Sequence, residues 1–126
     1  MRTFLCTTVL GLTAALQASM VCGQTLDPRT FAICTGRLSA LMEHEWLLSD
    51  SRADQTERQR DAMQEIAEAV TPPQEAAAAL NLRIEAKQAQ AALLSLATFS
   101  GNATTAGIAA RRSEELISEC TALLLG

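Results

Sequence analysis

The sequence is poor in the residues that most often bind nucleic acids or catalyse reactions. Its 126 residues include no tyrosine, one tryptophan, three phenylalanines and one histidine. Proteins that bind single-stranded nucleic acid need aromatic platforms and basic grooves, and this acidic chain has no basic cluster. It has no polybasic face for anionic membranes and no glycine-rich phosphate loop. The composition therefore argues against nucleic-acid binding, and no motif indicates a cofactor.

The first residues have the features of a secretory signal peptide. Arg2 precedes an apolar run, and small residues come just before Gln24. We therefore expect a cleaved signal at 1–23 and a mature domain at 24–126, with no stable membrane insertion after cleavage. Cys22 raises the alternative of a lipoprotein, but the residues before it make a poor lipid-attachment motif. This start predicts a periplasmic or secreted protein.

Cysteine is scarce in the segment that remains. Removal of 1–23 leaves only Cys34 and Cys120, and neither belongs to a CxxC pair. Metal binding and thiol redox chemistry are therefore disfavoured, whereas two cysteines in an oxidising compartment most often form a structural disulfide. The sequence predicts a disulfide between Cys34 and Cys120.

Hydrophobic periodicity predicts helices, and no stretch shows strand-like alternation. Asp27 and Pro28 make a typical helix start, and a second start is indicated at 71–74, where Thr71 begins a capping box. Short links favour a small antiparallel up-down four-helix bundle, which would bring Cys34 and Cys120 to the same end. The expected helices span about 28–49, 52–70, 72–99 and 104–124.

Glu45 is an unusual residue in the first predicted helix. At 100° per residue it falls in the middle of the apolar side, and a carboxylate there is costly unless it is paired. Lys87, the only lysine, falls on an apolar side of the third helix. We expect Glu45 to pair with Lys87, or otherwise with Arg83. The alternative is that these flexible side chains reach solvent. The apolar side of the first helix consists of Phe31, Cys34, Leu38, Leu41, Met42 and Leu48.

The opposite side of the same helix carries a narrow stripe of small and apolar residues. Glycine inside a helix costs about 1 kcal/mol relative to alanine, so Gly36 is either tolerated or allows another backbone to approach closely. We interpret the stripe as a surface for a second protomer or an envelope protein, the alternative being an ordinary exposed surface. It consists of Ile33, Gly36, Ala40 and Leu47.

No catalytic constellation is visible. His44 lies in a cluster that resembles a metal motif, Met42 to Trp46, but adjacent helical residues point about 100° apart and cannot converge on one ion. We therefore expect neither a metal site nor an enzyme. The favoured function is a structural or protein-interaction module of the cell envelope. The alternative is a carrier that holds a small apolar ligand between its helices, because the alanine-rich segment 72–99 permits a gap.

Overall fold

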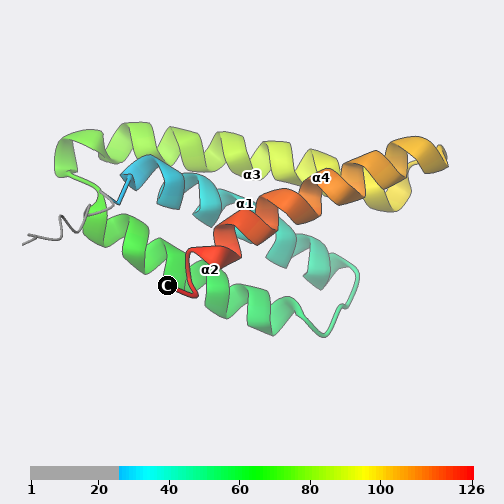
Figure 1. Cartoon of the computed structure of the whole chain (residues 1–126), viewed down its shortest axis with the longest axis horizontal. Helices are drawn as coiled ribbons and strands as arrows, with labels where there is room; N and C mark the ends of the chain where they lie inside the picture. The colour runs from blue at the N-terminus through cyan, green and yellow to red at the C-terminus, as the bar shows by residue number, and fades with distance from the viewer. Residues whose placement is uncertain (1–25) are drawn as a thin grey trace, which may run out of the picture.

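The computed structural model describes residues 26–126, which form four α-helices and one 3-10 turn (Figure 1). Successive helices run in opposite directions, and these residues contain no strand. The predicted all-α, antiparallel four-helix fold is therefore confirmed. The elements are α1 (Pro28–Leu47), α2 (Ala53–Val70), η1 (Pro73–Glu75), α3 (Ala76–Phe99) and α4 (Ala103–Ala122).

The predicted signal peptide at 1–23, the lipidation alternative at Cys22 and the predicted start at Gln24 lie outside the described residues. Within 26–126, no helix combines the length and the apolar character that a membrane crossing requires.

Helix α1 lies at the centre of the packing. It contributes ten buried residues, whereas the longer α3 contributes two. Helices α2 and α3 pack along α1, and α4 packs mainly on α3 while also touching α1. Burial of the apolar side of α1 drives this arrangement, as its periodicity predicts. The core cluster comprises Phe31, Cys34, Leu38, Met63, Ala67 and Cys120.

A disulfide joins Cys34 of α1 to Cys120 near the end of α4, which confirms the predicted pair. The two Cα atoms lie 5.3 Å apart, and both side chains are buried in the core cluster. Because α4 makes most of its contacts with α3, the covalent link supplies a second attachment to the central helix.

Of the two helix starts predicted from capping residues, the one at Asp27 is confirmed and the one at 71–74 is not. The backbone N–H of Arg29 donates to Asp27 Oδ1 at 3.0 Å at the start of α1. Asn102 caps α4 in the same way. Thr71, by contrast, donates to the carbonyl of Ala67 at 2.5 Å and so closes α2. The predicted start at 71–74 is wrong by a few residues: Pro73 disfavours helical geometry at Pro72, which is extended, and α3 begins only after η1.

The stripe interpreted as a partner surface is largely an internal contact. Gly36 and Ala40 are buried, and a Cβ added at Gly36 would overlap the carbonyl oxygen of Arg83 and lie 3.0 Å from the backbone nitrogen of Lys87. The close backbone approach that glycine allows is made by α3 of the same chain. Ile33 is half-buried, and Leu47 stays 70% exposed at the end of α1. Gly36 and Ala40 are therefore not available as a surface for a second protomer, because other parts of the same chain cover them.

Candidate functional site

The predicted ion pair between Glu45 and Lys87 does not form. Lys87 Nζ lies 2.6 Å from Glu43 Oε1, in a half-exposed pair, and Arg83 turns toward α2. The reason is helical geometry: Glu43 comes seven residues after Gly36 and so continues the face that packs on α3, whereas Glu45 points away from that face. Glu45 is nevertheless buried, with 4% of its surface exposed. The predicted burial of Glu45 is confirmed, whereas its predicted pairing with Lys87 or Arg83 is not.

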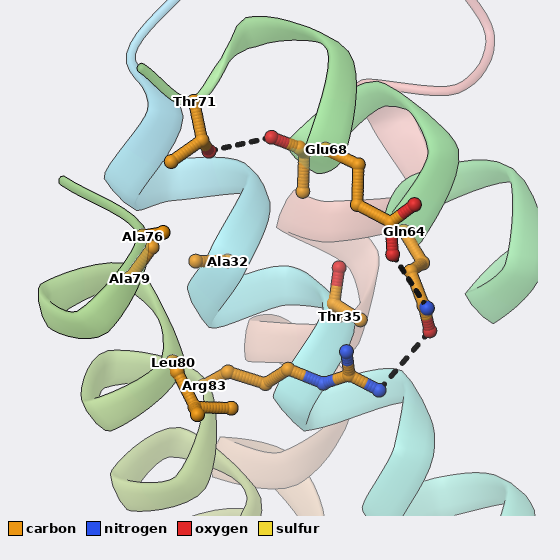
Figure 2. A pocket seen from close by; sticks show the side chains of 10 residues that line it. Ala32, Thr35, Gln64, Glu68, Thr71, Ala76, Ala79, Leu80 and Arg83 are labelled. Carbon is orange, nitrogen blue, oxygen red and sulfur yellow. Dashed lines mark hydrogen bonds between the residues drawn. The ribbon is translucent and has the colours of Figure 1, made fainter. Parts of the chain in front are cut away.

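A cavity of about 260 Å³ lies between α1, α2 and α3 (Figure 2). Helix α1 forms its floor through Ala32 and Thr35, while α2 and α3 form its two walls. Alanine side chains present only a methyl group, so walls built from them leave space where larger side chains would meet. We call this the alanine cavity. Its apolar lining residues are Ala32, Ala67, Ala76, Ala79 and Leu80.

A polar chain crosses one edge of the alanine cavity. Arg83 reaches from α3 toward α2, and its Nη2 donates to Gln64 Oε1 at 3.1 Å (Figure 2). The amide nitrogen of Gln64 in turn donates to Glu68 Oε1 at 2.8 Å. The cavity therefore combines apolar walls with a row of polar groups along one rim, a composition that is typical of small-molecule sites.

A second and larger hollow, of about 490 Å³, lies between the end of α1, the link that follows it, α3 and α4. Leucine and isoleucine side chains from three helices supply its apolar surface. We call it the Glu45 cleft. Its lining includes Leu41, His44, Glu45, Leu48, Asp50, Arg52, Leu94, Thr98, Ser113, Glu114, Ile117, Ser118 and Thr121.

Glu45 is the least satisfied polar side chain of this cleft. Its Oε2 atom is buried and has no hydrogen-bond partner among residues 26–126. The nearest cation is Arg52, whose Nε lies 3.9 Å from Glu45 Oε1, beyond hydrogen-bond distance. A buried carboxylate that lacks donors costs stability, since it has lost the water that solvated it.

Arg52 is held by Asp50 instead. Its Nη2 and Nε atoms lie 2.7 and 3.1 Å from the Asp50 carboxylate, and its backbone N–H donates to the same group at 2.9 Å. These bonds from Arg52 lower the pKa of Asp50 from 3.8 to about 2. Ser49, with φ of 54°, makes the turn that places both residues beside Glu45. The guanidinium is therefore committed to another carboxylate.

The far side of the cleft is stabilised by a buried hydrogen bond between α3 and α4. Gln90 Nε2 donates to Ser113 Oγ at 2.7 Å, and both side chains are buried. Nearer the end of the molecule, His44 Nε2 lies 2.9 Å from Thr98 Oγ1. The Gln90–Ser113 bond holds α4 against α3, and the His44–Thr98 contact joins α1 to α3.

Among the residues that line this cleft, the sequence identifies Glu45 as an unusual buried carboxylate and places Leu41 and Leu48 on the same apolar side. It identifies His44 only as a residue that is not a metal ligand. The spacing of Asp50 and Arg52 in a segment without helical periodicity is a signal for a charged turn that could have been used. Within residues 26–126, no three His, Cys, Asp or Glu side chains are grouped as ligands for a metal ion. No family model, curated protein or solved structure matches the chain.

Proposed function

We propose that the protein is an exported, non-enzymatic carrier that binds a small apolar molecule in the alanine cavity. The observation that carries this proposal is the cavity itself: α2 and α3 both pack on α1 but leave about 260 Å³ between them. A cavity of about 150 Å³ with apolar walls is enough to hold benzene, so this space suits a somewhat larger molecule. Arg83 and Gln64 at the rim can orient a polar end of the ligand.

The carrier accounts for the fold better than the interaction module does. The stripe on which the module was predicted is covered at Gly36 and Ala40 by α3 of the same chain. The alanine cavity, in contrast, is a largely apolar hollow between three helices, which is the kind of space that a carrier requires.

Export is part of this proposal. A disulfide persists in an oxidising compartment and is rare in the cytosol, so the bond in the core supports a periplasmic or secreted location. The predicted signal at 1–23 agrees with that location. Intact mass of the protein recovered from outside the cytoplasm tests it: a start at Gln24 is expected, and a retained 1–23 segment or a diacylglycerol on Cys22 would refute the predicted processing.

Ligand binding is tested with a small aromatic hydrocarbon, naphthalene, as probe. Wild-type protein should gain thermal stability in its presence, because a ligand that binds only the folded state stabilises that state. Ala79→Leu fills the cavity and should abolish the gain. Ala78→Leu, at the exposed neighbouring position outside the cavity, is the matched control and should keep it. Equal gains in both variants, or no gain in the wild type, would refute the proposal.

A further inference from the structure

The Glu45 cleft contains a feature that the proposed carrier function does not use. A carboxylate that is 4% exposed lines a hollow of about 490 Å³, and its Oε2 atom has no hydrogen-bond partner among residues 26–126. We propose that this cleft binds a small organic cation, a primary ammonium group on a short apolar body, and that the ammonium donates to the Glu45 carboxylate. This site is separate from the alanine cavity.

The carboxylate needs a donor that the protein does not supply. Arg52 is the nearest cation, yet it stands 3.9 Å away and gives its hydrogen bonds to Asp50. The residues nearest to Glu45 in the sequence, at the end of α1 and in the turn after it, therefore leave the Glu45 Oε2 atom without a hydrogen-bond donor. Because the terminal torsion of a glutamate is soft, either oxygen can turn toward a donor in the cleft. An ammonium group placed there would form a charge-assisted hydrogen bond with a desolvated acceptor.

The charge of the lining favours a cation over an anion. The described residues that line the cleft include three carboxylates, those of Glu45, Asp50 and Glu114, and one guanidinium, that of Arg52. A concave surface with low-dielectric walls concentrates this acidic field and attracts positive ligands. The same negative potential would repel an anionic ligand.

The oxygen atoms that line the cleft favour an ammonium group over a metal ion. Calcium takes six to eight oxygen ligands, and no three acidic, histidine or cysteine side chains are grouped for this within 26–126. An ammonium group requires only about three acceptors. Besides Glu45, the hydroxyl groups of Ser118 and Thr121 line the same cleft and can accept.

The rest of the cleft sets the size and character of the ligand body. Leu41, Leu48, Leu94 and Ile117 contribute apolar surface from α1, the link after it, α3 and α4. The volume falls within the range of about 300–1,000 Å³ that small-molecule pockets occupy. A linear or branched alkyl amine of a few carbons fits this combination of one buried anion and apolar walls.

Three probes of equal length separate the possible ligand classes. Hexylamine, hexanol and hexanoate are titrated into the oxidised protein while amide NMR shifts are recorded. Hexylamine should shift the amides of Glu45, Ser113 and Ile117 and bind at least about tenfold more tightly than hexanol. Hexanoate should cause no shift at these positions. Equal binding of hexanol and hexylamine, tighter binding of hexanoate, or no binding of hexylamine at millimolar concentration would overturn the proposal without any mutation.

A pair of variants then assigns the contact to one carboxylate. Glu45→Gln keeps the size of the side chain and removes its charge, so hexylamine affinity should fall by at least about tenfold. Glu85→Gln removes an exposed carboxylate of α3 outside the cleft and should leave affinity unchanged. Unchanged affinity in Glu45→Gln, or an equal loss in both variants, would refute the role of Glu45. Naphthalene binding at the alanine cavity should be unaffected by either change, so the two proposals can fail separately.

Discussion

Replacement of Gly36 by alanine tests the close contact between α1 and α3. The new Cβ would overlap the carbonyl oxygen of Arg83 and lie 3.0 and 3.1 Å from the Lys87 nitrogen and the Arg83 carbonyl carbon. These atoms are backbone, so relief requires the helices to separate by about 1 Å, which forfeits up to about half of the dispersion energy at the contact. Overpacking of this kind costs about 3 kcal/mol, and alanine recovers about 1 kcal/mol through helix propensity.

The expected net loss is therefore about 2 kcal/mol in the free energy of unfolding, or a fall of roughly 10 °C in Tm. Urea unfolding of the oxidised protein measures it. Gly107→Ala is the matched control, because a Cβ at this position of α4 meets nothing within 4 Å. The control should gain about 1 kcal/mol. If Gly36→Ala is as stable as the wild type, or gains stability as the control does, the helices are not in the contact described.

Further measurements test the other contacts. Reduction of the disulfide, which links residues separated by 86 positions, should lower the free energy of unfolding by about 4.5 kcal/mol in the chain-entropy model, and unchanged urea midpoints with and without reductant would contradict this. Ser113→Ala leaves the buried Gln90 amide without its hydroxyl partner and should cost about 1–3 kcal/mol, whereas adding Gln90→Leu should restore much of the loss; additive losses would show that the bond is absent. In an NMR titration, Asp50 should show a pKa of about 2, and Arg52→Ala should return it toward 3.8. Because folding lowers this pKa, the Asp50 contribution to stability is present above pH 3.8 and is lost as the pH falls toward 2; an unchanged pKa in the variant would exclude Arg52 as the cause.

The sequence predicts the helices and the disulfide because both depend on local or discrete signals. Periodicity of apolar residues marks each helix, and Asp27 marks the first helix start. Cys34 and Cys120 had only each other as partners in the segment after the predicted signal. The burial of Glu45 follows from the same periodicity, since it lies on the apolar side of α1.

Partners between helices were harder to predict, since periodicity defines a face but not the helix that covers it. Gly36 was correctly read as a possible site of close backbone approach, yet only the packing register shows that the approaching backbone is that of α3. The same register carries Lys87 to Glu43 rather than Glu45. The two hollows depend on how three helices meet, which no single segment encodes.

Replacement of Glu45 by methionine tests whether the protein keeps this buried carboxylate at a cost in stability. Its carboxylate is buried, while Arg52 is largely exposed and remains bonded to Asp50 when Glu45 is removed. Glu45→Met should therefore leave no unpaired charge behind, and removal of an unsatisfied buried group should raise the free energy of unfolding by about 1–3 kcal/mol. The exposed Glu85→Met should change it by less than about 0.5 kcal/mol.

A gain in Glu45→Met would show that the wild-type chain keeps a destabilising carboxylate, which is the usual mark of a functional position. Saturation with hexylamine should then stabilise the wild type and leave the variant unaffected, because the cation satisfies the group that the variant lacks. Urea unfolding with and without the amine measures both effects. A loss of stability in Glu45→Met would mean that the carboxylate already has its partner in Arg52, and the ammonium site would have no unsatisfied acceptor on which to form.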